Sequence, residues 1–227
     1  MEISPDSIIY WSRGPFILNA TLLFTWIIMA LLVLGSWLVT RNLGTDVRIS
    51  SRQNFLEAIV AGMARQLDAV SRNKPEGVFP FVGTLFLFIA VSNLLAVVPG
   101  FKPPTGSLST GAALAACVFL AVPVYGVSQV GAGPYFLNYL RPTPLMLPFN
   151  VMGELSRTLA LAVRLFGNVM SGSMIGAILL VIAPLVFPVL MQLLGLLTGM
   201  VQAYIFSILA TIYISAGMEV GQRKKTS

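Results

Sequence analysis

The sequence predicts an all-α membrane protein with five transmembrane helices, one amphipathic surface helix and a long tilted helix pair at the C-terminal end. Two observations carry this prediction. Hydrophobic residues make up 56% of the 227 residues and charged residues only 10%, whereas a soluble domain has about 25% charged residues. Mean hydropathy is +0.86, and the apolar residues gather in long uncharged runs. Residues 1–227 are therefore expected to form a single polytopic membrane domain.

The same composition excludes several classes of function. The chain has no histidine and a single cysteine, Cys117, which excludes Cys/His metal sites, Cys–His dyads and Ser–His–Asp triads. The aspartates Asp6, Asp46 and Asp68 lie outside the predicted spans, so an intramembrane aspartyl pair is excluded. The net charge of +6 comes from basic residues beside apolar spans, and no nucleic-acid binding is expected. We expect no cofactor, no metal ion and no active site for ATP chemistry in this chain.

The N-terminal third is predicted to hold one span and one surface helix. Residues 1–16 form an external segment, and 17–39 form the first span, whose uncharged run is longer than the apolar stretch of about 7 to 15 residues in a signal peptide. In residues 41–76, apolar residues recur at spacings of three and four opposite charged ones, which predicts an amphipathic helix lying on the membrane. The many Arg and Lys residues of this segment place it in the cytoplasm and the N-terminus outside.

Two further spans are predicted at 78–98 and 108–127. The first ends at Pro99–Gly100 and carries a lone amide, Asn93, near its outer end. The second is rich in Ala and Gly, small residues that let helices approach closely.

The C-terminal part is predicted to form a long tilted helix at 148–183 and a last helix at 189–217. A helix of about 36 residues is about 54 Å long at 1.5 Å per residue. It cannot stand upright in a hydrocarbon core of about 30 Å, so it must tilt, kink or lie partly in the interface. The basic tail, 218–227, is expected in the cytoplasm, which agrees with an odd number of spans.

Polar residues of the long helix gather on one face, within an arc of about 100°. An ionised Arg at the centre of a spanning helix costs about 2.5 to 3.5 kcal/mol on insertion scales, so its usual place is a protein interior or a water-filled path. No charged residue follows Arg164 until Glu219. Arg164 is therefore unlike an Arg at a helix end whose side chain reaches the lipid headgroups, and that interpretation is the weaker one. Arg157 can equally form a structural pair with Glu154. The residues on this face are Asn150, Glu154, Arg157, Arg164, Asn168 and Ser171.

A second polar position lies in the last helix. Gln202 shares a face with Gly195, Thr198 and Gly199, and the spacing of the two glycines allows close contact with another helix. An antiparallel neighbour joined by a short turn would set the Gln202 amide against the Arg164 guanidinium.

Four segments together resemble subunit a of the F-type ATP synthase membrane sector, the ATP synthase A chain family: NFLEAI at 54–59, residues 93–105, RLFGN at 164–168 and QAYIF at 202–206. The resemblance covers most of the chain and implies an ion-translocating stator subunit of a rotary motor in the bacterial inner membrane. Its implied partners are a rotating ring of small two-helix proteolipid subunits, peripheral-stalk subunits and membrane lipid. It also implies two offset half-channels, an Arg164 that holds a ring carboxylate ionised, and a path lined by Asn168 and Gln202.

The chain departs from the family pattern at two positions. Many members carry a carboxylate or a histidine where this chain has Ser173, and a partner of that kind where it has Gly195. Three explanations stay open. Water with Ser173, Ser171 and Asn168 carries the proton, or Glu154 contributes more than usual, or the ion is Na⁺, which oxygen ligands bind without a proton relay. We expect H⁺, with Na⁺ as the alternative.

Two other classes of function stay open as alternatives. A self-contained channel or secondary transporter could use Glu154, Arg157 and Arg164 as a substrate or gating site, but no convincing repeat relates the two halves of the chain. In a non-conducting assembly subunit of a respiratory complex, Arg164 would be merely structural.

Overall fold

The computed structural model describes residues 6, 9–13, 16–41, 61–62, 64–65, 77–98, 100–131, 133, 135, 146–182 and 187–222. Within these ranges, five helices are long and apolar enough to cross a membrane, which confirms the predicted helical membrane class. The predicted surface helix in 41–76 lies almost wholly outside the described residues. The five helices are α1 Ala20–Thr40, α3 Val78–Leu95, α4 Leu108–Val130, α6 Met146–Ile182 and α7 Phe187–Gln222.

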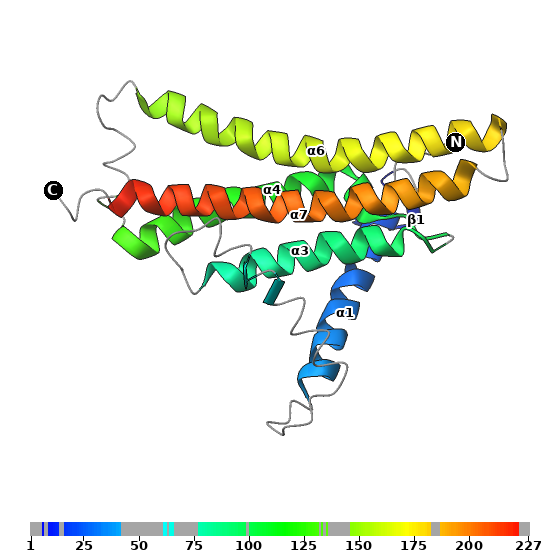
Figure 1. Cartoon of the computed structure of the whole chain (residues 1–227), viewed down its shortest axis with the longest axis horizontal. Helices are drawn as coiled ribbons and strands as arrows, with labels where there is room; N and C mark the ends of the chain where they lie inside the picture. The colour runs from blue at the N-terminus through cyan, green and yellow to red at the C-terminus, as the bar shows by residue number, and fades with distance from the viewer. Residues whose placement is uncertain are drawn as a thin grey trace.

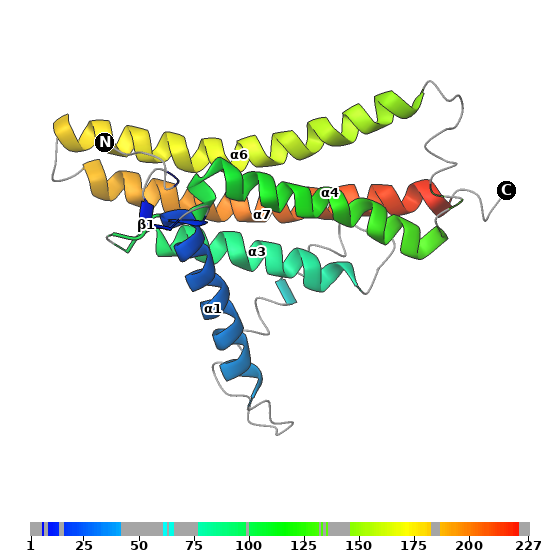
Figure 2. The same ribbon diagram turned by 180° about the vertical axis from the view of Figure 1, so that it is seen from behind.

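Four of these helices form an elongated bundle, and the fifth projects from it (Figure 1). Helices α3, α4, α6 and α7 run along the long axis of the molecule, whereas α1 leaves the bundle at a steep angle (Figures 1 and 2). Helices α6 and α7, of 37 and 36 residues, form the long pair at the C-terminal end. Each is about 55 Å long at 1.5 Å per residue.

Several helix ends differ from the predicted spans. Helix α3 ends at Leu95 rather than at 98, and α7 continues to Gln222, where a cytoplasmic tail had been predicted from 218. Hydropathy marks where an apolar run ends, whereas a helix ends where its backbone hydrogen bonds end.

A short hairpin precedes α1, where an external segment and the start of the first span had been predicted. Strand β1, Ile9–Arg13, pairs antiparallel with β2, Phe16–Asn19, so α1 begins only at Ala20. Aromatic and β-branched residues dominate both segments and favour strands, a signal that hydropathy alone does not separate from a helix.

Asp6 ties the N-terminal region to the bundle. Its carboxylate accepts hydrogen bonds from Thr21 Oγ1 and from Ser107 Oγ, both at 2.6 Å. Ser107 is also the N-cap residue of α4, because its side chain accepts a hydrogen bond from the backbone N–H of Ser109. One carboxylate therefore joins the first turn of α1 to the start of α4.

The core lies between α3, α4, α7 and the middle of α6. Helix α6 contributes only its central turns to this core, through Leu161, Ala162 and Leu165, and most of its other apolar side chains are exposed. Such an exposed apolar surface is suited to lipid or to another membrane protein. The other helices contribute Val82, Leu85, Ile89, Ala115, Val118, Phe206, Ala210 and Ile214.

The close packing of α6 on α4 depends on Gly111. A Cβ at this position would lie 3.0 Å from the carbonyl oxygen of Ala162, two residues before Arg164. We expect Gly111→Val to force α6 away from α4, at a cost of about 1 to 3 kcal/mol. The measurement is the Tm of the purified protein. Gly35→Val is the matched control, because a Cβ at Gly35 meets nothing within 4 Å, and equal Tm values for the two variants would contradict the prediction.

Candidate functional site

Arg164 lies at the midpoint of α6, on the side that faces away from the core. Its neighbour Leu165 is fully buried, whereas the Arg164 side chain is exposed. No residue in the described part of the chain forms a hydrogen bond or an ion pair with its guanidinium. The charge is therefore presented outward from the centre of an apolar helix.

Arg157 is placed differently from Arg164. Its guanidinium carbon lies 5.6 Å from the centre of the Tyr213 ring on α7, a cation–π contact between the two long helices. Such a contact is worth about 0.5 to 1 kcal/mol at an exposed site. This geometry favours a structural role for Arg157. Glu154, one turn earlier on α6, is half-buried, and its backbone carbonyl accepts a hydrogen bond from Thr158 Oγ1 at 2.9 Å.

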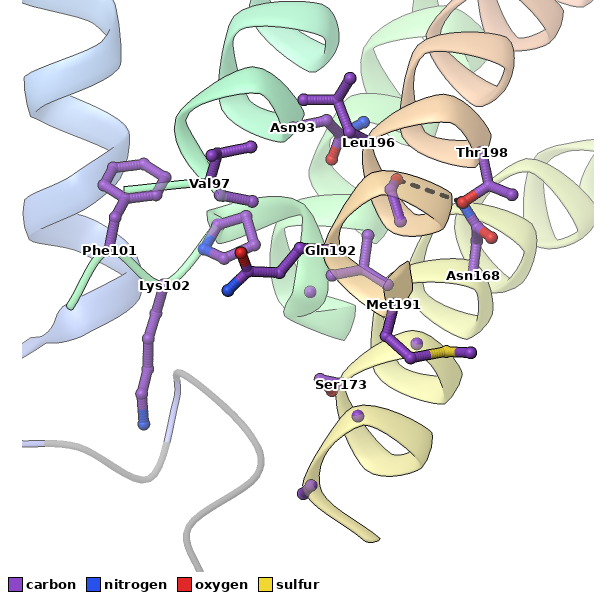
Figure 3. Close-up of a pocket in the computed structure, with 18 of the residues that line it drawn as sticks. Asn93, Val97, Phe101, Lys102, Asn168, Ser173, Met191, Gln192, Leu196 and Thr198 are labelled. Carbon is purple, nitrogen blue, oxygen red and sulfur yellow. Dashed lines mark hydrogen bonds between the residues drawn. The ribbon is translucent and has the colours of Figure 1, made fainter. Parts of the chain in front are cut away.

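A cavity of about 510 Å³ opens between the C-terminal half of α6, the N-terminal half of α7, the end of α3 and the loop after it (Figure 3). Asn168 and Ser173 reach it from α6, and Gly195 from α7, where a Cβ would meet nothing within 4 Å. The cavity is large enough to hold several water molecules. Its other polar lining residues are Asn93, Lys102, Gln192 and Thr198.

The hydroxyl groups of this cavity present oxygen lone pairs. Ser173 Oγ donates its proton to the Met170 carbonyl at 2.8 Å, and Thr198 Oγ1 donates to the Leu194 carbonyl at 2.9 Å. Because each hydroxyl proton is directed to its own helix, the remaining lone pairs can accept from water or coordinate a cation.

Neutral groups dominate the lining of the cavity. Among the described residues that line it, Lys102 is the charged one, and no carboxylate is present. The Lys102 side chain extends away from the other labelled residues (Figure 3). A cation inside the cavity would therefore meet amide and hydroxyl oxygens rather than a titratable relay.

Gln202 lies deeper in the bundle, one turn of α7 beyond Thr198. It is 7% exposed, and its Nε2 has no hydrogen-bond partner among the described residues. A buried donor without a partner costs about 1 to 3 kcal/mol, and native proteins rarely keep one without a reason.

The structure brings together only some of the predicted site residues. Asn168 and Ser173 line the cavity, whereas Glu154 and Arg157 lie further back along α6 and do not. Ser171 does not line it either; its hydroxyl donates to the Asn168 carbonyl at 3.2 Å. The predicted meeting of the Gln202 amide with the Arg164 guanidinium is not made, because Arg164 faces away from the core whereas Gln202 is buried, and no hydrogen bond joins these two described residues.

Sequence reasoning did not place Asn93, Lys102 or Gln192 at this site. Asn93 could have been suspected from the sequence, because it is a lone amide in an apolar span. Nothing in the sequence pointed to Lys102 or Gln192, because their place in the cavity depends on how the end of α3 packs against α6 and α7.

Comparison with known proteins assigns the family. Residues 22–215 match the model of the family described as ATP synthase A chain. The chain is 58% identical to ATP synthase subunit a 1 from Chlorobaculum parvum (strain DSM 263 / NCIMB 8327), over the full length of both proteins. It is also 58% identical to ATP synthase subunit a 2 from Acaryochloris marina (strain MBIC 11017), over 98% of this chain and 95% of that protein. It is 56% identical to ATP synthase subunit a from Nitrosospira multiformis (strain ATCC 25196 / NCIMB 11849 / C 71), over 95% of this chain and 86% of that protein. The chain therefore belongs to the ATP synthase A chain family, as its sequence motifs implied.

Proposed function

We propose that this chain is the ion-translocating stator subunit of a bacterial F-type ATP synthase, and that Arg164 faces the carboxylates of a rotating proteolipid ring. The observation that carries the proposal is the exposed guanidinium at the midpoint of α6, which has no partner among the described residues. A charged side chain in the middle of a membrane helix usually pairs with another group or faces a water-filled path. A carboxylate on a neighbouring subunit supplies such a group.

Arginine suits this role because of its chemistry. A guanidinium keeps its charge at any workable pH and presents a broad fork of donors to a carboxylate, whereas a lysine in the same place could lose its proton. A fixed positive charge at close range favours the ionised form of each passing carboxylate, which then releases its ion. Each ion that crosses supplies about 2.3 kcal/mol per 100 mV, so several crossings per turn can drive ATP synthesis elsewhere in the complex.

The cavity beside α6 and α7 is proposed as the outer half-channel. It lies at the end of the bundle that carries the loop 101–106. The charge pattern of the sequence predicts that this loop is on the external side of the membrane. In this orientation the N-terminus is outside and the C-terminus is cytoplasmic. Asn168 and Ser173 line the route inward, and Gln202 lies further along α7. The proposed partners are the ring, peripheral-stalk subunits and membrane lipid.

We propose H⁺ as the translocated ion. Water in the cavity can carry a proton past neutral side chains, with hydroxyl and amide oxygens as acceptors. Na⁺ is the second candidate, favoured by one observation: the described residues of the lining offer oxygen ligands from Asn168, Ser173 and Thr198 but no carboxylate.

ATP-driven pumping into inverted membrane vesicles separates the two ions. With H⁺ as the ion, we expect acidification of the lumen without added Na⁺, a complete loss of the gradient when a protonophore is added, and ATP hydrolysis at alkaline pH that does not depend on Na⁺. The measurements are lumenal pH, ²²Na⁺ uptake and the rate of ATP hydrolysis. Accumulation of ²²Na⁺ that persists with the protonophore, together with hydrolysis stimulated by Na⁺, would contradict H⁺ translocation.

A further inference from the structure

A buried polar cluster joins α3 to α7 and to the 3-10 turn η2, Pro104–Gly106, at the wall of the cavity. At its centre is Asn93 of α3, which is 4% exposed. Its Nδ2 donates to the backbone carbonyl of Gly199 on α7 at 2.9 Å, and its Oδ1 accepts from Thr105 Oγ1 at 2.9 Å. Ser92 Oγ lies 3.4 Å from the same Thr105 hydroxyl. Both ends of the Asn93 amide are therefore engaged.

The glycine at 199 makes this contact possible. A Cβ at Gly199 would lie 2.9 Å from both Cβ and Cγ of Asn93, closer than real side chains approach. Without a side chain, the backbone of α7 comes close enough for the amide to reach a carbonyl. Figure 3 shows Asn93 on α3 directed toward α7, at the edge of the cavity.

This hydrogen bond distinguishes one position of α7 from its neighbours. Apolar helix faces pack with similar energies when one helix turns or slides slightly, because dispersion contacts have little direction. A hydrogen bond from a fixed amide to one carbonyl is directional and is lost after a shift of about 1 Å. The buried amide would then be left unpaired, at a cost of about 1 to 3 kcal/mol.

The residues that the contact controls are those of the proposed ion path. Thr198 directly precedes Gly199 and lines the cavity, and Gln202 follows within one turn. A rotation of α7 that turned Thr198 away from the cavity would also move the Gln202 amide.

We propose that Asn93 is a positioning residue for ion translocation: through the Gly199 carbonyl it sets the rotation and height of α7 and so places Thr198 and Gln202 on the ion path. This inference rests on the proposed function of the cavity as a half-channel. Thr105 and Ser92 hold the Asn93 amide in the required orientation.

Asn93→Leu in the complete ATP synthase tests the inference, because leucine has a similar volume and can make neither hydrogen bond. We expect ATP-driven pumping in inverted vesicles to fall about 10-fold or more, since a displacement of about 1 Å can cost that much. The amount of assembled complex and the ATP hydrolysis of the complex in uncoupling detergent should be unchanged. Thr84→Val is the matched control on α3, because the hydrogen bond that the Thr84 hydroxyl makes with a described residue stays within its own helix, to the Phe81 carbonyl at 2.8 Å.

A double-variant cycle with Asn93→Gly and Gly199→Ala identifies the contact itself and does not depend on Asn93→Leu assembling, because glycine at 93 removes both the Cβ and the Cγ that a Cβ at 199 would meet. If Gly199→Ala acts by pushing against Asn93, the double variant should pump at the rate of Asn93→Gly alone, so that the two losses do not multiply. Losses that multiply, or wild-type pumping by either single variant, would overturn the inference. Arg164→Ala separates the two proposals: normal pumping by that variant contradicts the proposed function, whereas its loss of pumping alongside normal Asn93 variants contradicts only the positioning role.

Discussion

Arg164→Ala is expected to abolish ATP synthesis driven by an ion gradient while the complex still assembles. Assembly should survive because the side chain is exposed and has no hydrogen bond or ion pair with any described residue of its own chain. Synthesis should be lost because, in the proposed mechanism, nothing then holds the ring carboxylate ionised between the half-channels. Synthesis is measured in vesicles with an imposed gradient, and assembly by copurification of the proteolipid ring.

Two further substitutions sharpen this test. Arg164→Lys keeps a positive charge but loses the planar fork of donors, so we expect a large loss of synthesis as well. Arg157→Ala is the matched control on the same helix. It loses a contact with the Tyr213 ring worth about 0.5 to 1 kcal/mol and should leave synthesis within a few-fold of wild type. Normal coupled synthesis in Arg164→Ala would rule out the role proposed for this residue.

The long helices were predictable because their signals are local. Helix α6 follows from an apolar run between Pro148 and Pro184, and the placement of Arg164 on its polar face follows from helical periodicity. Charge alone also indicated that Arg164 was the unusual residue. The different position of Arg157 was not predictable, because the ring it contacts lies on another helix.

The hairpin and the cavity could not be predicted from sequence patterns, for different reasons. Strand β2 continues directly into α1 without a break in hydropathy, so an apolar run could not show where one ended and the other began. The cavity depends on pairing between distant segments: Asn93 and Gly199, which contact each other at its wall, are 106 residues apart in the chain. No periodicity within one helix reports such a contact.

The two positions at which the chain departs from the family pattern lie together in this cavity. Ser173 and Gly195 both line it, from opposite long helices. A Cβ at Gly195 would meet nothing within 4 Å, so the absence of a side chain there leaves open volume rather than a packed contact. At these two positions, among the described residues that line the cavity, the chain therefore provides room for water rather than a titratable side chain, which is compatible with the proposed translocation of H⁺ through water.

Gln202→Leu is expected to separate function from stability. Its Nε2 is buried without a partner among the described residues, so an apolar side chain of similar size removes a desolvation cost of about 1 to 3 kcal/mol. The Tm of the complex should be unchanged or higher. Coupled synthesis should nevertheless fall about 10-fold to 100-fold, because a leucine on the proposed ion path cannot donate a hydrogen bond to water there.

Ser207→Ala is the control for this change, five residues further along α7. Ser207 is also 7% exposed, but its hydroxyl donates to the Ala203 carbonyl of its own helix at 2.8 Å. Removing it should change coupled synthesis little, because its proton is already engaged within α7. A structural glutamine would give the reverse pattern, with a lower Tm and normal synthesis per assembled complex for Gln202→Leu. That outcome would mean that the buried Gln202 donor has a partner within the complex and takes no part in transport.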